Sequence, residues 1–337
     1  MIILAGDIGG TSTRLMLVES KDDHIEERLE QHFPSGKYAS LFDIVDEFLS
    51  DQPIAAQDIE AVCFAVAGPI SKGKVKFTNL PWIISIKELH QHFSTDHIAL
   101  INDFEAIGYG IEALTDDDLL TIQPGTPVAK APKALIGAGT GLGIAIMHHG
   151  LHRYWVMATE GGHIDFAPTD EEQFSLLEHM KHKYHRVSLE RVLSGQGLVN
   201  IYYYVRDTPL FNQKENKELR QLVFNHKGQS APFIADYALN KHDSMAQRAL
   251  DIFIRIYGSA AGNLALTTLP YGGLYLVGGI APKLAGALQD NRFTSCFRDK
   301  GRMSGLLENV PVHLVLNTKV GLYGAAVFAK HIPNQNA

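Results

Sequence analysis

The chain opens with two apolar runs separated by a turn rich in glycine. Residues 1–5 and 14–19 have strand character, and the turn between them carries Gly6, Asp7 and the run Gly9-Gly10-Thr11. A Walker-type phosphate loop needs a Gly-Lys-Ser/Thr ending that leads into a helix, and a dinucleotide fingerprint also needs a helix after its glycines. Because a second strand follows here, neither pattern fits, and the segment predicts a strand, a glycine turn with an aspartate in it, and a strand.

The same pattern returns in the second part of the chain. Residues 134–136 and 144–147 read as strands, and between them lies "GAGTGLG", with Gly139, Thr140 and Gly141 at its centre. Glycine suits such turns because it adopts positive φ and lets backbone amides approach an anion. Asp7 cannot bind phosphate itself, but it can hold a magnesium ion or its waters. One glycine turn is most often a plain hairpin, whereas one in each half favours phosphate binding.

The rest of the chain alternates between strand-like and helix-like stretches, which is typical of an α/β protein with mixed sheets. We expect a loop near a domain boundary at 121–132, a polar surface excursion at 206–232 and a final helix over 321–330. Strands are expected at 61–66, 97–101 and 274–277, and helices at 40–49, 171–184, 188–204 and 244–266. Two units that each begin with a strand–turn–strand predict a bilobed protein with a ligand cleft between its lobes.

Composition narrows the function classes. The 337 residues carry a formal net charge of -7, which argues against a general nucleic-acid binder. Only Cys63 and Cys296 are present, so neither a disulfide framework nor a cysteine zinc site is expected. No apolar run reaches the roughly 18 residues of a membrane span, and no signal peptide precedes the first strand. We therefore expect a cytoplasmic protein without membrane contacts.

Asn102 and Asp103 follow an apolar strand, just before helical spacing begins. Asp103 can be a helix N-cap, which stabilises a helix by about 1 kcal/mol. It can also be a general base, because α/β proteins bind ligands at the carboxyl ends of their strands. The two interpretations are compatible.

Three further segments hold candidate site residues. "EGGHIDFAP" gathers Glu160, His163 and Asp165 around a glycine pair, which suits a polyhydroxylated ligand better than a metal ion. "VSLERVLSG" reads as a helix start with Ser188 as its cap, where Glu190 is favoured by the helix dipole. "YLVGGIAP" is a strand that meets a Gly-Gly turn, either a close approach to a nucleotide or a plain strand end.

Together these stretches resemble the bacterial-type glucokinase family, within the hexokinase, actin and heat-shock-70 ATPase superfamily. The cysteine-rich zinc motif usual in the related sugar kinase and repressor family is absent, and no DNA-reading helices precede residue 1, which favours the glucokinase family. The resemblance runs nearly from end to end, through Gly6-Asp7-Ile8-Gly9-Gly10-Thr11, Ile101-Asn102-Asp103-Phe104, Gly137-Ala138-Gly139-Thr140-Gly141-Leu142-Gly143, Glu160-Gly161-Gly162-His163-Ile164-Asp165-Phe166, Glu190-Arg191-Val192-Leu193-Ser194-Gly195 and Val277-Gly278-Gly279-Ile280.

The resemblance implies a two-lobed actin-like ATPase fold, also called ribonuclease H-like, with mixed sheets flanked by helices. It implies a small α/β domain over 1–113, to which a C-terminal helix in 317–337 returns, and a large α/β domain over 114–316. The implied reaction is transfer of the ATP γ-phosphate to the C6 hydroxyl of glucose, with Mg²⁺, in a homodimer. The implied site residues are the base Asp103, the sugar contacts Asn102, Asp103, Glu160, His163 and Glu190, the phosphate turns Gly6, Asp7, Gly9, Gly10, Thr11, Gly139, Thr140 and Gly141, the adenosine neighbours Gly278 and Gly279, and Asp7 toward magnesium.

Two alternatives stay open at this point. A kinase of another hexose or of an amino sugar would carry the same motifs. A sugar-sensing regulator would bind without catalysis, although Asp103 beside two intact glycine turns argues against it.

Overall fold

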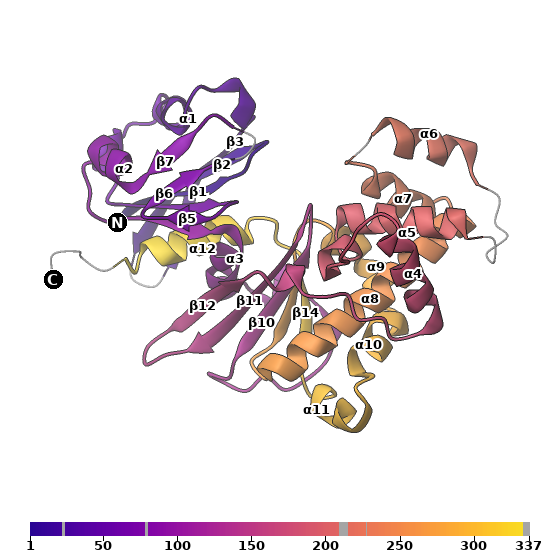
Figure 1. Ribbon diagram of the computed structural model, residues 1–337. Coiled ribbons are helices and arrows are strands. Elements are labelled where there is room, and N and C mark those ends of the chain that lie inside the picture. Colours follow the sequence, from indigo (N-terminus) through magenta and orange to yellow (C-terminus); the bar gives the residue numbers. More distant parts are fainter. Residues whose placement is uncertain (22–23, 78–79, 209–214, 227, 333–337) are drawn as a thin grey trace. The chain divides into compact units, whose positions relative to one another are not determined.

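The computed structural model describes the whole chain except residues 22–23, 78–79, 209–214, 227 and 333–337. The chain forms two compact units. Unit 1 comprises Met1–Thr115 and Asn317–Ala337, and unit 2 comprises Asp116–Leu316. Figure 1 labels their helices and strands. Within the described residues, no helix is both long enough and apolar enough to cross a membrane.

Unit 1 is built on a five-stranded mixed sheet with the order β3-β2-β1-β4-β8. β1 runs antiparallel to β2 and parallel to β4, which in turn runs parallel to β8. The strands are β1 (Ile2–Ile8), β2 (Thr13–Lys21), β3 (His24–Phe33), β4 (Ala61–Val66) and β8 (Ile98–Asn102). A small second sheet holds β5 (Ile70–Ser71), β6 (Lys74–Lys76) and β7 (Ile83–Ser85). β1 and β4 are central strands, and their apolar residues are almost completely buried.

The described residues of unit 1 form four α-helices, of which α1 is amphipathic and α3 and α12 pack closely against each other. They are α1 (Leu41–Leu49), α2 (Ile86–Phe93), α3 (Asp103–Ile111) and α12 (Val320–Ala329). α1 begins at a Ser40 capping box and buries one apolar stripe, as its spacing predicts. α12 packs against α3 so tightly that a Cβ on Gly324 would lie 1.7 Å from the carbonyl oxygen of Ala106. The C-terminal helix therefore holds the helix that begins at Asp103.

Unit 2 repeats this arrangement with a longer sheet of order β12-β11-β10-β13-β14-β9. β10 pairs antiparallel with β11 and parallel with β13, as β1 does with β2 and β4. Its strands are β9 (Leu119–Gln123), β10 (Lys133–Ala138), β11 (Leu142–His149), β12 (Tyr154–Thr159), β13 (Leu274–Val277) and β14 (Val312–Val315). The mixed α/β architecture and the two strand–turn–strand openings predicted from the sequence are confirmed.

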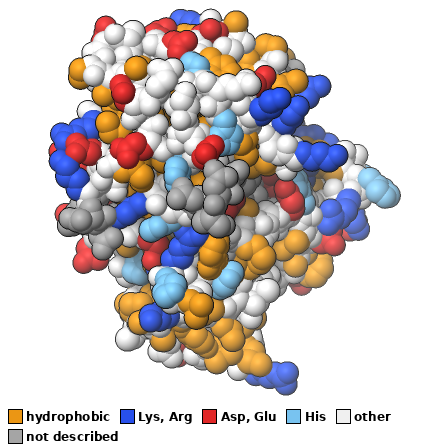
Figure 2. All heavy atoms as spheres, turned by 90° about the vertical axis from the view of Figure 1, so that its left-hand side faces the viewer, with side chains coloured by type: hydrophobic (Ala, Val, Ile, Leu, Met, Phe, Trp, Pro, Cys, Tyr) orange, Lys and Arg blue, Asp and Glu red, His pale blue; other side chains and the backbone are white. Residues whose placement is uncertain are grey.

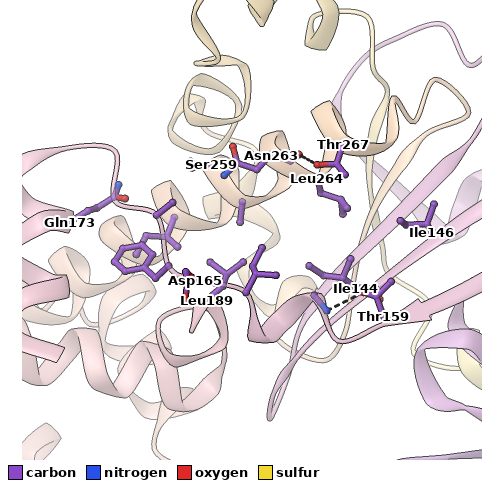
Figure 3. Close-up of a pocket in the computed structure, with 16 residues that line it drawn as sticks. Ile144, Ile146, Thr159, Asp165, Gln173, Leu189, Ser259, Asn263, Leu264 and Thr267 are labelled. Atoms are coloured by element: carbon purple, nitrogen blue, oxygen red, sulfur yellow. Dashed lines mark hydrogen bonds between the residues drawn. The ribbon is translucent and has the colours of Figure 1, made fainter. Parts of the chain in front are cut away.

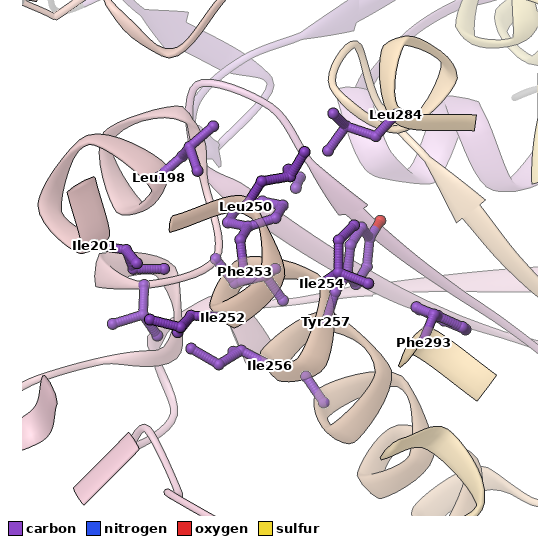
Figure 4. Close-up of a cluster of buried hydrophobic side chains, with 14 of the residues drawn as sticks. Leu198, Ile201, Leu250, Ile252, Phe253, Ile254, Ile256, Tyr257, Leu284 and Phe293 are labelled. Carbon is purple, nitrogen blue, oxygen red and sulfur yellow. The ribbon is translucent and has the colours of Figure 1, made fainter. Parts of the chain in front are cut away.

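Several helices of unit 2, among them α5, α7 and α10, pack against α8 (Ser244–Thr268), and Figure 4 shows apolar side chains around it. α8 is buried along most of its length, and Phe253 and Tyr257 are fully buried in it. The other helices are α4 (Glu171–Lys181), α5 (Gly195–Asp207), α6 (Lys217–Asn225), α7 (Ala231–Leu239), α9 (Ala285–Leu288), α10 (Asn291–Arg298) and α11 (Ser304–Leu307). The predicted strand at 274–277 and the predicted helix at 244–266 are confirmed.

Two expected loops are only partly loops. The stretch 121–132 was expected to be a loop, but its first residues belong to β9, which pairs with β14 and buries Gln123. The stretch 206–232 was expected to be a surface excursion, but it contains α6, whose Leu219 and Val223 are buried. β9 pairs with a strand far away in the sequence, whereas α6 packs against the next helix, α7 (Ala231–Leu239). Residues 209–214 and 227 of the second stretch lie outside the described residues.

The expected helix over 188–204 is broken. Leu189–Arg191 forms a short 3₁₀ turn, and α5 starts only at Gly195. The Ser188 side chain makes no capping hydrogen bond, whereas the Ser194 side chain accepts one from the Gly197 amide. The true helix start is therefore six residues later than predicted, and Glu190 lies on a turn outside the helix.

Candidate active site

In unit 1 the candidate residues lie at the carboxyl ends of three neighbouring parallel strands. Ile8 of β1 is in register with Val66 of β4, and Val66 with Asn102 of β8. Asp7 precedes Ile8, and Asp103 follows Asn102. The sheet therefore brings the first glycine turn and the Asn102-Asp103 pair to one edge, where α/β proteins bind ligands.

Asn102, and not Asp103, is the N-cap of α3. Its Oδ1 accepts hydrogen bonds from the amides of Phe104, at 2.9 Å, and Glu105, at 3.3 Å. The N-cap interpretation of Asp103 is therefore wrong. Asp103 is the first residue of the helix, is half-buried, and its Oδ1 accepts the Phe104 amide at 2.9 Å.

Asp7 lies on β1 and not inside the turn, directly across from Arg14 of β2. Burial raises the pKa of the Asp7 carboxyl, the negative charge of Asp103 raises it further, and Arg14 and His32 act in the opposite direction. Arg14 is held by the carbonyl of Thr318 and by the Glu30 carboxylate, at 3.0 and 2.7 Å. Two interacting carboxylates at a strand edge form a local site that a divalent cation would stabilise.

The first glycine turn is a four-residue connection from β1 to β2. The Gly9 amide donates to the carbonyl of Ser12 at 2.9 Å, and Ser35 donates its hydroxyl to the Gly9 carbonyl at 2.9 Å. Gly10 and Thr11 are at least partly exposed at the tip. Gly6 differs because it is buried in β1, where a Cβ would lie 2.6 Å from the Phe64 ring. Glycine is therefore required at position 6 because a side chain would clash with the Phe64 ring.

In unit 2 the second glycine turn is tighter and is held from outside. Ala138 and Leu142 close the hairpin, so Gly139, Thr140 and Gly141 form its loop. The Gly139 carbonyl accepts the amide of Gly195, the first residue of α5, at 2.8 Å. The turn is therefore fixed to the start of a helix more than fifty residues further along the chain.

Gly278 and Gly279 follow β13 and lie at the base of this turn. Gly278 has a φ of +88°, which strongly favours glycine, and a Cβ there would lie 2.8 Å from the Ala138 carbonyl oxygen. The Ile280 amide donates to the same carbonyl at 3.3 Å. Gly279 has open space around its Cα. Within unit 2 the structure thus brings together the two glycine segments that the resemblance assigns to ATP.

Glu160, His163 and Glu190 come from two short 3₁₀ segments that lie side by side. The Leu189 amide donates to the Ile164 carbonyl at 2.8 Å and thereby joins the segments. The Glu160 and His163 side chains are 92% and 58% exposed, with His163 Nε2 3.6 Å from Glu160 Oε2. Glu190 differs because its Oε2 accepts the Leu142 amide at 3.0 Å.

Asp165, the third polar residue of the Glu160 loop, pairs with Arg186 at 2.7 Å. Among the described residues no cluster of three or more histidine, cysteine, aspartate or glutamate side chains is arranged to bind a metal ion. The arrangement of Glu160 and His163 is that of exposed hydrogen-bonding groups on a loop, which fits a hydroxylated ligand.

A cavity of about 300 Å³ lies behind this loop, between β11, the loop and α8 (Figure 3). Its walls are mainly apolar and include Ile144, Ile164, Leu189 and Leu264. Glu160, His163 and Glu190 do not line it. The cavity is therefore separate from the hydrogen-bonding side of the loop.

The two units, each with a hairpin and parallel strands, define the actin-like ATPase fold of sugar kinases. A ROK family glucokinase from Streptomyces griseus, solved in complex with glucose and AMPPNP, has this fold, with a TM-score of 0.63, 20% identity and coverage of 98% of this chain and 99% of that one. The glucokinase of an Antarctic psychrotroph is more similar, with a TM-score of 0.83, 32% identity and 98% of both chains covered.

Comparison of sequences gives the same result. The Glucokinase family model matches residues 4–332. The glucokinase of Trichormus variabilis is 44% identical, with 98% of this chain and 99% of that protein covered, and that of Pectobacterium atrosepticum is 34% identical, with 98% and 97% covered. The chain belongs to the glucokinase family.

Two contacts that position the candidate site residues were not predicted from the sequence. Arg14 faces Asp7 across the hairpin, and the backbone amide of Leu142 holds Glu190. In a hairpin, the residues that face each other can be found by counting outward from the turn, so the pairing of Asp7 with Arg14 could have been predicted from the sequence. The hydrogen bond between Leu142 and Glu190 joins residues 48 positions apart, and no pattern of neighbouring residues predicts it.

Proposed function

We propose that Asp103 is the general base of this ATP-dependent hexose kinase, which phosphorylates glucose at C6. The observation that carries the assignment is that Asp103 directly follows β8 at the strand edge and lies near enough to Asp7 for its negative charge to raise the pKa of the Asp7 carboxyl. As the C6 oxygen attacks the γ-phosphorus and the bond from that phosphorus to the bridging oxygen of ADP breaks, Asp103 accepts the hydroxyl proton. The negative charge of the leaving group stays on ADP.

Sugar recognition is assigned to Asn102, Asp103, Glu160, His163 and Glu190. Carboxylates accept hydrogen bonds from sugar hydroxyls, and an imidazole can donate or accept. The adjacent, largely exposed Glu160 and His163 side chains support this assignment. The Asn102 side-chain oxygen already accepts two backbone amides, so its NH₂ group is the part that we assign to the sugar.

The phosphates of ATP are assigned to the backbone amides around Gly9, Gly10 and Thr11 and around Gly139, Thr140 and Gly141, with Gly278 and Gly279 beside the adenosine. The residues at the strand edge of unit 1 fit Mg²⁺, because Asp7 and Asp103 interact there and magnesium typically binds one or two carboxylates together with substrate phosphates. Bound Mg²⁺ would offset the negative charge of the phosphates. Asp7 would hold it directly or through water.

A coupled assay of the purified chain with ATP and Mg²⁺ tests the substrate. We expect glucose to be turned over with a higher kcat/KM than mannose, fructose or glucosamine. Replacing ATP with ADP or polyphosphate tests the donor. A higher kcat/KM for glucosamine or mannose than for glucose would instead favour the kinase of another sugar, and no turnover of any hexose would favour a sensor.

The homodimer is proposed on the distribution of exposed apolar side chains in unit 2. β12 is an edge strand of its sheet, and Trp155 and Met157 on it are 44% and 53% exposed. Ile164 and Phe174 follow within twenty residues and are 52% and 57% exposed. Light scattering at several concentrations measures the assembly state, and a monomer at micromolar concentration would reject the dimer.

The cytoplasmic location also stays a proposal, and cell fractionation with an antibody to the chain tests it. Interaction with nucleic acid is not expected. Figure 2 shows basic side chains interspersed with acidic ones on the face that it presents, in keeping with the net charge of -7.

A further inference from the structure

Glu190 and the second glycine turn share one hydrogen bond and one tight contact. Glu190 Oε2 accepts the Leu142 amide at 3.0 Å, immediately after the turn. A Cβ built on Gly141 would lie 2.6 Å from the same oxygen, closer than Cβ atoms approach other atoms in proteins. The position of one carboxylate oxygen is thus set by Gly141, the last residue of the turn, and by Leu142, the first residue of β11.

The other carboxylate oxygen is the one that remains for a ligand. Among the described residues, Glu190 Oε1 has no hydrogen-bond partner, and the side chain is half-buried. The 3₁₀ turn that carries Glu190 is anchored separately, because Ser194 donates its hydroxyl to the Glu190 carbonyl at 2.8 Å. The carboxylate therefore bridges an anchored backbone and the glycine turn.

We propose that Gly141 and the Leu142 amide position Glu190 for the sugar, and so couple sugar binding to the nucleotide turn. The inference rests on the proposed function, in which Glu190 contacts glucose and the turn contacts ATP phosphates. A sugar hydroxyl on Oε1 stabilises the carboxylate that holds the Leu142 amide, and the turn is thereby ordered before ATP arrives. By thermodynamic linkage, ATP on the turn favours the sugar by the same factor.

Two alanine substitutions in one turn provide a matched pair. Gly139 and Gly141 are two residues apart, and neither has a φ in the left-handed region. A Cβ on Gly139 meets nothing within 4 Å, whereas a Cβ on Gly141 meets Glu190. We expect Gly141→Ala to raise the glucose KM roughly tenfold, the scale of one displaced buried hydrogen bond. With both variants measured at saturating ATP, Gly139→Ala should raise the glucose KM much less than Gly141→Ala does.

Two substitutions of Glu190 separate its two contacts. In Glu190→Gln the amide oxygen can still accept the Leu142 amide, so the turn keeps its support while the sugar contact is altered. In Glu190→Ala both are lost. We expect both variants to raise the glucose KM, but only Glu190→Ala to raise the ATP KM, by at least about threefold at saturating glucose. Thermal unfolding of each variant identifies one that is not folded.

The outcomes are distinguishable. If Glu190→Ala leaves the glucose KM unchanged, the sugar role of Glu190 fails, and the inference fails with it. If both Glu190 variants raise the glucose KM but Gly141→Ala does not, the sugar role stands and the positioning role is rejected. If Gly141→Ala does not fold, NMR of the ¹⁵N-labelled wild-type chain tests the coupling instead, through the amide resonance of Leu142. A shift on adding glucose without nucleotide supports the coupling, and an unchanged resonance rejects it.

Discussion

The two units share one strand topology but differ in the residues beside their glycine turns. In both, a hairpin precedes a parallel strand, and a glycine turn joins the hairpin strands. One position before the closing pair of the hairpin, unit 1 has Asp7 across from Arg14, whereas unit 2 has Gly137 across from Gly143. Unit 1 therefore places charge beside its turn, and unit 2 places bare backbone there.

Unit 2 obtains its charge from elsewhere. Glu190 reaches the turn from a segment 48 residues away, and the turn is also tied to the start of α5. The backbone of a residue inside a strand, such as Asp7, is fixed by pairing with a strand on each side. A charged group recruited from another segment can respond to a ligand. If the proposed site is correct, unit 1 supplies the general base for the chemical step, and unit 2 supplies Glu160, His163 and Glu190 for recognition of the sugar.

The strongest test of this division is Asp103→Asn. We expect the variant to fold and to bind glucose, but to lose at least about 10²-fold in kcat, the usual scale for a general base. Steady-state kinetics and calorimetric titration with glucose measure the two properties, and the exposed Asp51→Asn serves as a control. Near-normal turnover in Asp103→Asn would assign that residue to helix structure alone.

The second test destabilises the helix packing of unit 1 and leaves its charged residues unchanged. Gly324→Ala places a Cβ 1.7 Å from the Ala106 carbonyl oxygen, so α12 and α3 must separate, at a cost of about 1–3 kcal/mol in the free energy of unfolding. Gly321→Ala, on the same helix, meets only Ile107 at 3.7 Å and should stabilise the chain by up to about 1 kcal/mol. Urea unfolding compares the pair, and equal stabilities would argue against close packing of α3 and α12.

The third test addresses recognition by unit 2. His163→Ala should weaken glucose binding by roughly 1–3 kcal/mol, because sugar hydroxyls lose a partner, while ATP binding changes little. Isothermal titration with glucose and with a non-hydrolysable ATP analogue measures both affinities, and exposed His148→Ala is the control. Unaltered glucose affinity in His163→Ala would remove this residue from the sugar site.

The smallest expected effect concerns the Asp7 carboxyl of unit 1, which makes the free energy of unfolding depend on pH. The pKa of Asp7 is raised in the folded chain above its ordinary value of 3.8, so the folded state binds this proton more tightly than the unfolded state does. Stability therefore falls as the pH rises from about 3.8 through the folded pKa, and the loss is complete above it.

Asp7→Asn removes this dependence. In the absence of Mg²⁺ and ATP, the variant should be more stable than the wild type at pH 7, by no more than about 1 kcal/mol, and the difference should shrink toward pH 4. Thermal unfolding at the two pH values checks this. A wild type that is the more stable at pH 7 would mean that Asp7 is paired in the folded state.

Some of these features could be read from the sequence because their causes are local. The glycine turns, the apolar spacing of α1 and the placement of Asn102 and Asp103 after a strand depend on neighbouring residues, and the structure has all three. The start of α5 was misplaced because Ser188 and Ser194 are both plausible caps, and only the second makes the capping bond. β9 was missed because its pairing partner, β14, lies almost 190 residues later.

By itself, the sequence determined the α/β class and the strand–turn–strand motif in each half, because periodicity and glycine placement are properties of short segments, and its motifs carried the resemblance to the glucokinase family. Only the tertiary structure decided that Asn102 caps α3, that α12 closes on α3 through Gly324, and that Glu190 meets Gly141 and Leu142. These contacts depend on distances of a few tenths of an ångström between atoms, most of them in segments far apart in the chain. A local pattern of residues does not contain such distances, since they arise when the whole core packs.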